Sequence, residues 1–405
     1  MKSAATFLLA ARQCEIGELE ALSQTSELVG VIARLIHELQ RERGTSNVYL
    51  ASHGERFAAQ RLAQVDQSTR LEGEVRGQFH TLDTDATRAR NGARLFSRVA
   101  IVLHALDGLP ALRDSVGRQA LTPRESTAAY TRLVSGLLAV VFEAADSASD
   151  PQVSRALVSM FNFMQGKEFA GQERAFGAAV FASGRIDAAG RQQWLHLVES
   201  QQACFHVFTD FSDPAILAAD LASQDAELVA RLERLRRIGT TSTAALDPEL
   251  SRAWYDCCTD RIDAMKIVED LLSAHLRDLC AERISLARAE LRDQSAMLES
   301  LWRGASVAGE GTAYGPHIER SLVAMVHEQS QRLLAVSAEL ETVRASLNER
   351  KLIERAKGVL MAERHLTEED AHKALRRMAM NQNKRLADIA QAVLSMAEML
   401  PGSPR

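Results

Sequence analysis

Apolar side chains recur three and four residues apart through most of the sequence, and this periodicity most strongly limits the possible fold. The plainest example is the stripe of Leu28, Val31, Leu35 and Leu39, which predicts a long amphipathic helix over residues 26–50. We find no segment with the apolar–polar alternation of a half-buried strand. The 405 residues include only eight prolines, so residues that break helices are few. The aromatic content is also low, at 5%. The sequence therefore predicts an all-α protein.

Glycine and proline residues divide the first three quarters of the chain into separate helices. We predict breaks at Gly54, Gly108–Pro110, Asp150–Pro151 and Ser183–Gly184. The predicted helices cover residues 26–50, 60–80, 86–106, 124–145, 153–163, 168–181, 187–209, 225–238 and 248–301. Short turns between long amphipathic helices favour antiparallel packing. Residues 1–302 are therefore predicted to form two antiparallel helical bundles.

A second periodic region follows a stretch without periodicity. Residues 304–315 are rich in glycine and small side chains, so we place a flexible linker at 303–316. The apolar stripe resumes with Ile318, Leu322, Met325, Leu333, Val336, Leu340, Val343 and Leu347. This spacing suits a coiled-coil helix over 317–349 through which two copies of the chain pair. A single helix packed against the preceding bundles would bury the same stripe, and this alternative stays open.

Three short helices are predicted over residues 350–400. The apolar face of the first helix ends near His365, and Thr367 is a suitable N-cap for the second. Three acidic residues follow Thr367 and stabilise the first turn of that helix. The polar break at 381–383 precedes a third apolar repeat that begins at Leu386. Together these helices predict one small shared core.

The charge of residues 350–400 differs from that of the whole chain. This region has ten basic and seven acidic side chains, a formal charge of +3, whereas the full sequence carries −5. Four cations and three amide side chains, with no acid, lie between Arg376 and Arg385. Such a local patch suits a polyanion, although ordinary solvated surface charges give the same composition.

Residues 344–400 closely resemble the ANTAR domain, a three-helix module of bacterial transcription antitermination regulators. The resemblance rests on Ala-Lys-Gly at 356–358, the paired arginines and Met-Ala-Met at 376–380, and Arg-Leu-Ala-Asp at 385–388. It implies that two dimerised modules bind two stem-loops of a leader mRNA and prevent a terminator hairpin. The polar positions expected to be exposed and to contact RNA are Lys357, Arg376, Arg377, Asn381, Gln382, Asn383, Lys384 and Arg385. The expected packing positions are Ala356, Gly358, Met361, Ala371, Leu375, Ala379 and Leu386.

Two charged segments of the predicted bundles lie among apolar residues. Glu42 and Arg43 belong to the segment QRERGTS, and Glu173 and Arg174 stand in a segment with several phenylalanines. Charges buried in this way require partners. Structural ion pairs, either between neighbours or across helices, would satisfy them without a ligand.

These segments resemble the NIT domain, an all-helical sensor of nitrate and nitrite. The resemblance covers most of residues 25–275 and is most specific in the elements ERGxS and KExAGQERAxGAxxFAxG. It implies an anion site built from arginines, and a planar guanidinium matches two nitrate oxygens better than lysine does. The residues expected in this site are Arg43, Arg174 and Arg236, with Arg41 and Arg237 as close substitutes.

The two resemblances together predict a nitrate- or nitrite-responsive transcription antiterminator, expected to serve nitrate assimilation genes. The expected domains are a sensor at 1–302, a linker at 303–316, a coiled-coil helix at 317–349 and an RNA-binding module at 350–400. Ligand binding is expected to release or align the RNA-binding module. Another small anion or a protein partner as the effector, and duplex DNA as the target, stay open as alternatives.

Other functional classes are not indicated. The common nucleotide-binding, metalloprotease and serine-hydrolase motifs are absent from the sequence, so no catalytic residue is expected. Five cysteines form no CxxC pair, and neither a metal nor another cofactor is expected. Arg12 interrupts the short apolar N-terminus, and we expect no segment apolar enough to cross a membrane. We therefore expect a cytoplasmic homodimer.

Overall fold

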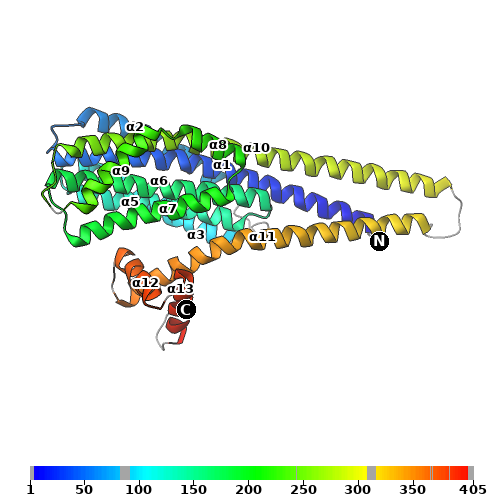
Figure 1. Cartoon of the computed structure of the whole chain (residues 1–405). Helices are drawn as coiled ribbons and strands as arrows, with labels where there is room; N and C mark the ends of the chain where they lie inside the picture. Colours follow the sequence, from blue (N-terminus) through cyan, green and yellow to red (C-terminus); the bar gives the residue numbers. More distant parts are fainter. Residues whose placement is uncertain are drawn as a thin grey trace. The chain divides into compact units, whose positions relative to one another are not determined.

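The computed structural model describes residues 4–82, 92–242, 244–307, 316–364, 366, 368–382 and 384–399 (Figure 1). These residues form helices and turns without a β-strand, which confirms the predicted all-α class. The chain divides into two compact units, Met1–Gln329 and Ser330–Arg405, which are called unit 1 and unit 2 below.

The first bundle of unit 1 contains five helices. They are α1 (Ala4–Ala51), α2 (Ala58–Thr81), α3 (Gly92–Asp107), α4 (Leu109–Gly117) and α5 (Pro123–Ser147). Helix α1 packs against α2 and α5, and α3 packs against α5. The sequence Thr-Pro-Arg-Glu starts α5 with a capping box, in which Thr122 and Glu125 each accept a backbone N–H of the other.

The second bundle contains the five following helices. They are α6 (Pro151–Ser183), α7 (Ala188–Phe211), α8 (Pro214–Ser223), α9 (Ala226–Thr241) and α10 (Leu250–Val307). An aspartate side chain caps the N-terminus of α6, α7, α8 and α9, and these four residues are Asp150, Asp187, Asp213 and Asp225. Helix α6 packs against α7 and α10, and α8 and α9 pack against α10.

The two bundles meet along their longest helices. Helix α1 contacts both α6 and α10, and α5 contacts α6. Farther along, the first half of α1 packs against the second half of α10 through Ile16, Leu19 and Ala287. The interface between α1, α6 and α10 therefore lies at the centre of unit 1, and the candidate site lies there.

Some predicted helices of unit 1 differ from those observed. Helix α1 begins at Ala4 instead of residue 26, and α4 and α8 were not predicted. The two helices predicted over 153–163 and 168–181 form the single helix α6. Gly166 lies within it, and a Cβ atom there would come within 2.7 Å of the Phe205 ring of α7. This glycine therefore permits close helix packing and does not end a helix.

Two segments of unit 1 are long and apolar enough to cross a membrane by length and composition alone. They are Ala93–Gly117 and Pro123–Ser147, so the expectation that no such segment exists was wrong. The second segment is α5, which packs against α1, α3 and α6 and buries Tyr130, Leu137 and Val141. Its apolar character accounts for part of the bundle core.

Helices α11 (Pro316–Arg364), α12 (Glu368–Gln382) and α13 (Leu386–Met399) follow, and α11 crosses the boundary between the units. The core of unit 2 contains residues of all three helices: Ala356, Leu360, Ala371, Leu375, Ala379, Ile389, Ala390 and Leu394. This core confirms the predicted three-helix module. The predicted helix ends at His365 and Thr367 lie outside the described residues.

The stripe of α11 that suggested a coiled coil is buried in part. Leu340, Val343 and Leu347 are buried, whereas Leu333 is 60% exposed. Pairing with a second chain stays a prediction. The domain boundaries also stay predictions, because most of the expected linker, 308–315, lies outside the described residues.

Candidate anion-binding site and candidate RNA surface

Helix α6 carries four charged side chains into the interior of unit 1. Lys167, Glu168, Glu173 and Arg174 are each between 0% and 6% exposed. The helix packs against α1 on one side and against α7 and α10 on others, so its charges lie between helices and not at the surface. Buried charges require partners with good geometry, and the partners of each charge define the site.

Arg43 of α1 pairs with Glu168 of α6. The two ion-pair distances are 2.6 Å from Nη1 to Oε1 and 3.1 Å from Nη2 to Oε2. The Nη1 group also donates to Oγ1 of Thr131 at 2.9 Å, and Gln40 donates to Glu168 Oε2 at 2.9 Å. This bidentate pair neutralises the charge of Arg43 in the described structure.

Glu42, the neighbour of Arg43 in α1, is satisfied in a similar way. Arg113 of α4 donates to both carboxylate oxygens at 2.9 and 3.0 Å, and the Tyr130 hydroxyl donates to Oε1 at 2.7 Å. Burial, together with the negative charge of Glu42, raises the pKa of Tyr130. Cross-helix ion pairs therefore satisfy Glu42 and Arg43, as the alternative without a ligand predicts.

Arg174 differs from these charges because no carboxylate pairs with it in the described part of the chain. Its Nη1 donates to Oγ1 of Thr259 at 3.0 Å, and its guanidinium lies 5.0 Å from the ring centre of Tyr255. The residue is only 6% exposed. The hydroxyl and the aromatic ring partly solvate the cation but leave its charge without a counterion.

Two glycines allow the arginines of α1 and α6 to cross between the helices. A Cβ atom on Gly171 of α6 would lie 2.8 Å from Nη2 of Arg43, which is too close. A Cβ atom on Gly44 of α1 would lie 3.2 Å from Nη2 of Arg174. Each arginine thus lies over a glycine of the other helix, which gives the glycines of ERGxS and AGQER a structural reason.

Glu173 receives hydrogen bonds from three side chains. Arg236 of α9 donates to Oε1 at 2.7 Å and to Oε2 at 2.6 Å, Trp194 donates to Oε1 at 2.9 Å, and Gln201 donates to Oε2 at 2.7 Å. Burial opposes ionisation, but the hydrogen bonds and charge of Arg236 outweigh it and lower the pKa of Glu173. The carboxylate is therefore ionised at neutral pH, and both of its oxygens already accept hydrogen bonds.

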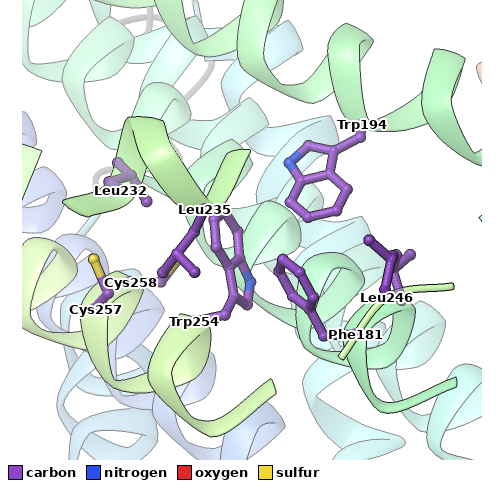
Figure 2. Packing of buried hydrophobic residues seen from close by; sticks show 9 residues of the cluster. Phe181, Trp194, Leu232, Leu235, Leu246, Trp254, Cys257 and Cys258 are labelled. Carbon is purple, nitrogen blue, oxygen red and sulfur yellow. The ribbon is translucent and has the colours of Figure 1, made fainter. Parts of the chain in front are cut away.

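An apolar cluster supports this charged layer. Figure 2 shows Trp194 and Trp254 beside Phe181, with the two indole ring centres 5.0 Å apart. A Cβ atom on Gly177 would collide with the Trp254 ring, and one on Gly239 would collide with Trp194. Both glycines therefore make space for the indoles, so that Trp254 of α10 packs closely on α6 and Trp194 of α7 packs closely on α9.

The expected arginines thus occupy different environments. Arg43 and Arg174 lie where α1 crosses α6, and Arg236 is held by Glu173, the neighbour of Arg174 in sequence. Of the close substitutes, the Arg41 side chain is 51% exposed and pairs with Glu38, and Arg237 is exposed. The roles of these arginines in binding stay predictions.

A further buried ion pair was not predicted from the sequence. Lys167 Nζ lies 2.6 Å from Oε2 of Glu269 on α10, and neither side chain is exposed. The same ammonium lies 3.5 Å from Nδ1 of His37 on α1. Burial, and then the charge of Lys167, lowers the pKa of His37 to about 2. No local sequence signal marks this pair, because its members are far apart in the chain.

Most of the expected RNA-contacting residues lie at the surface of unit 2. Arg377, Asn381, Gln382, Lys384 and Arg385 are exposed and Arg376 is partly buried, while Asn383 lies outside the described residues. Arg385 forms ion pairs with Glu349 at 3.1 Å and Asp388 at 3.2 Å.

Three expectations on α11 were wrong. Lys357 is only 8% exposed, although we expected it at the surface. Gly358 and Met361, expected to pack, are both exposed. Ala356 and Leu360, four residues apart, set the buried face of this helix, and Met361 lies one position beyond it. The expected packing of Ala356, Ala371, Leu375 and Ala379 is confirmed.

Fold and site define an all-helical protein with buried cations in its first unit and a small helical module with a charged surface in its second. The family described as "Nitrate and nitrite sensing" (NIT) matches residues 34–277, and the ANTAR domain matches residues 341–394. The chain therefore belongs to the NIT family of nitrate- and nitrite-sensing proteins and carries an ANTAR domain.

Similarity to known proteins extends over nearly the whole chain. The sequence is 34% identical over 396 residues to the nitrate regulatory protein of Klebsiella oxytoca, which covers 98% of this chain and 96% of the relative. The structure resembles that of the NasR transcription antiterminator with a TM-score of 0.62 and 32% identity. That similarity covers 96% of this chain and 98% of the other.

Proposed function

We propose that the protein is a transcription antiterminator controlled by nitrate or nitrite. In this proposal the anion binds between helices of unit 1, and the ANTAR domain binds paired stem-loops in a leader mRNA. RNA binding prevents a terminator hairpin from forming, and the controlled genes serve nitrate assimilation. The similarity to a nitrate regulatory protein and to a transcription antiterminator, each over nearly the full chain, supports both parts.

The observation that carries the proposal for the ligand is the buried, unpaired cation of Arg174. It lies in the NIT domain between α6 and α10, where Thr259 and Tyr255 already orient its guanidinium. A small planar monoanion supplies the missing counterion and accepts the parallel N–H donors. Arg43 and Arg236 complete the proposed site, and the anion competes there with the carboxylates of Glu168 and Glu173.

This competition links binding to a change in helix packing. A ligand shifts an equilibrium only by its difference in affinity for the two states, and a nearly complete switch requires about 5.5 kcal/mol. Pairs between α1, α6 and α9 hold the helices in the described arrangement. An anion that replaces a carboxylate partner changes these contacts and releases or aligns the ANTAR domain.

The proposal includes the remaining organisation of the chain. The sensor comprises residues 1–302, a linker 303–316, a coiled-coil helix 317–349 and the RNA-binding domain 350–400. Two copies pair through the coiled-coil helix, so that two ANTAR domains bind two stem-loops. The protein acts in the cytoplasm as a regulator without catalytic activity, and its effector is nitrate or nitrite without a further cofactor.

The central test measures RNA binding with and without the anion. The purified full chain is titrated with a two-stem-loop leader RNA at constant ionic strength, in nitrate, nitrite or chloride. We expect tighter binding in nitrate or nitrite than in chloride, and no comparable gain for duplex DNA. Equal RNA affinity in all three salts would refute control by these anions.

A pair of variants tests the site itself. Arg174→Gln is expected to remove the effect of nitrate on RNA affinity, because the unpaired cation is lost. The control Arg252→Gln removes an exposed cation of α10 and should leave the effect intact. An unchanged nitrate response in the Arg174 variant would exclude Arg174 from the site without excluding antitermination.

A further inference from the structure

A second guanidinium near the candidate site also lacks a counterion. Arg261 of α10 is partly buried, and its Nη1 donates to Oε1 of Gln201 at 2.9 Å. No carboxylate forms an ion pair with it in the described part of the chain. Burial, and then the charge of Arg236, lowers the pKa of Arg261.

Arg236 and Arg261 share a single acceptor atom. Oε1 of Gln201 accepts from Nη1 of Arg261 at 2.9 Å and from Nη2 of Arg236 at 3.3 Å. The two guanidiniums carry like charges, and the oxygen that they share belongs to a neutral amide. An anionic oxygen in the same place interacts favourably with both cations.

The surrounding carboxylates form their hydrogen bonds and ion pairs with groups other than Arg261. Glu173 is already occupied by hydrogen bonds from Arg236, Gln201 and Trp194. Glu233 pairs with Arg236 on its exposed side, where its side chain is 56% exposed. Asp220 of α8 interacts electrostatically with Arg261, but the hydrogen bond that its carboxylate accepts comes from Gln224.

Four helices converge around this position. Arg236 comes from α9, Gln201 from α7 and Arg261 from α10, while Glu173 comes from α6. The apolar cluster of Figure 2 supplies Trp194, whose indole N–H donates to Glu173. An anion held here therefore contacts the helices whose relative positions the proposed switch must change.

We propose that Arg261 is an anion-binding residue, and that it forms with Arg236 a subsite for a small oxyanion. One oxygen of the anion takes the position that the amide oxygen of Gln201 occupies, so that it bridges the two guanidiniums. The inference deepens the proposed function and rests on it. It adds a residue of α10 to a site that the sequence assigned to α1, α6 and α9.

The test compares Arg261→Gln and Arg261→Lys with the wild-type full chain in nitrate and chloride. The control Arg252→Gln removes another arginine of α10, whose side chain is 86% exposed. Nitrate affinity is measured by calorimetry, and folding in chloride by circular dichroism. We expect Arg261→Gln to weaken nitrate binding roughly tenfold to hundredfold, the range for a lost charged hydrogen bond.

The lysine variant distinguishes a ligand contact from a packing role. Lysine keeps the charge but lacks the parallel N–H donors of a guanidinium, so the nitrate affinity of this variant should fall between those of the wild type and the glutamine variant. If Arg261→Gln folds poorly, Arg261→Lys decides: weakened nitrate binding supports the subsite, and wild-type affinity refutes it. Neither variant should unfold in chloride at a lower temperature than the wild type. Arg261→Gln removes an unpaired buried charge, and Arg261→Lys retains it.

A fluorescence measurement separates failure of this inference from failure of the proposed function. Replacement of Trp302 by Phe leaves Trp194 and Trp254 as the only tryptophans. Nitrate should change their emission in this background, and Arg261→Gln should move the midpoint of the change to roughly tenfold to hundredfold higher nitrate. Wild-type protein that does not bind nitrate would refute both proposals, whereas nitrate binding that is unaffected by either Arg261 variant would refute only the subsite.

Discussion

The two units place their cations in opposite environments. In unit 1, Arg43 and Arg174 are 2% and 6% exposed and lie between helices. In unit 2, Arg377 and Lys384 are exposed around a core of aliphatic side chains. A buried cation admits only a small anion, whereas exposed cations reach the phosphates of a folded polyanion. The placement of the charges thus separates the two ligands that the proposed function requires.

The comparison also concerns stability. Unit 1 contains charges removed from water, so its folding depends on carboxylate partners with good geometry. The hydrophobic core of unit 2 consists of aliphatic side chains, so its folding depends mainly on apolar packing, although Lys357 is also buried there. Substitution of a paired, buried charge in unit 1 should therefore lower stability, whereas substitution of an exposed cation in unit 2 should weaken ligand binding without a loss of stability.

The largest effect is expected when the partner of Arg43 is removed. Glu168→Gln leaves a guanidinium buried without its counterion, which should lower the free energy of unfolding by about 3–5 kcal/mol. Urea unfolding followed by circular dichroism measures this change. Glu233→Gln breaks an ion pair whose carboxylate is 56% exposed and should cost less than about 1 kcal/mol. Equal losses in the two variants would contradict the importance of burial.

A smaller loss is expected from one methyl group beside the indole rings. Gly177→Ala places a Cβ atom against Trp254, and overpacking of this kind costs about 1–3 kcal/mol. Gly73→Ala on α2 is the matched control, because its Cβ atom meets nothing within 4 Å. That substitution should stabilise the helix by about 0.5–1 kcal/mol. Calorimetric unfolding should show melting temperatures that move in opposite directions.

The buried imidazole of His37 predicts a dependence on pH. Its pKa falls from 6.5 to about 2 in the folded chain, so only the unfolded chain binds this proton between those values. The free energy of unfolding therefore decreases as the pH falls below about 6.5, by about 1.4 kcal/mol between about pH 7.5 and about pH 5.5. The charges that oppose protonation are those of Lys167, Lys266, Arg41 and Arg174.

Urea unfolding at the two pH values tests this contribution. His37→Gln should lose about 1.4 kcal/mol of the pH dependence, because no proton then binds to this position on unfolding. The control His206→Gln changes a side chain that is 79% exposed and should keep the wild-type dependence. The interpretation fails if both variants have the same pH dependence as the wild type.

The smallest effect concerns unit 2. Lys384→Gln should weaken RNA binding several-fold and reduce the slope of log affinity against log salt by about 0.7–1, the value for one lost phosphate contact. Its unfolding should match that of the wild type, because the side chain is exposed. Arg355→Gln, an exposed cation outside the predicted RNA surface, is the control and should keep the wild-type slope.

Helices were predicted well because their signal is local. The stripe from Leu28 to Leu39 defines a buried face within a few turns, and all of it is buried. The segments 153–163 and 168–181 were predicted as two helices but form one, and Gly166 between them makes room for Phe205, which is distant in sequence. A glycine that admits a neighbouring side chain and a glycine that ends a helix are the same letter in the sequence.

The site was predicted less completely for a related reason. The motifs drew attention to Arg43 and Arg174, but Glu168 could be recognised as the partner of Arg43 only across 125 positions. Arg261 has no distinctive neighbours in the sequence and stands out only through its contact with Gln201. The charge balance of a site depends on tertiary contacts, and composition does not reveal it.

Helix α10 extends far beyond the candidate subsite, so a small tilt at the subsite becomes a larger displacement at the end of the helix. The helix is continuous from Leu250 to Val307 and begins only a few turns before Arg261. Roughly 46 residues separate Arg261 from the end of the helix, which corresponds to a rod of ~69 Å. A tilt of about one degree at the subsite moves the far end of such a rod by ~1.2 Å. A movement too small to break the local packing is thus amplified along the helix to a displacement on the scale of an atom.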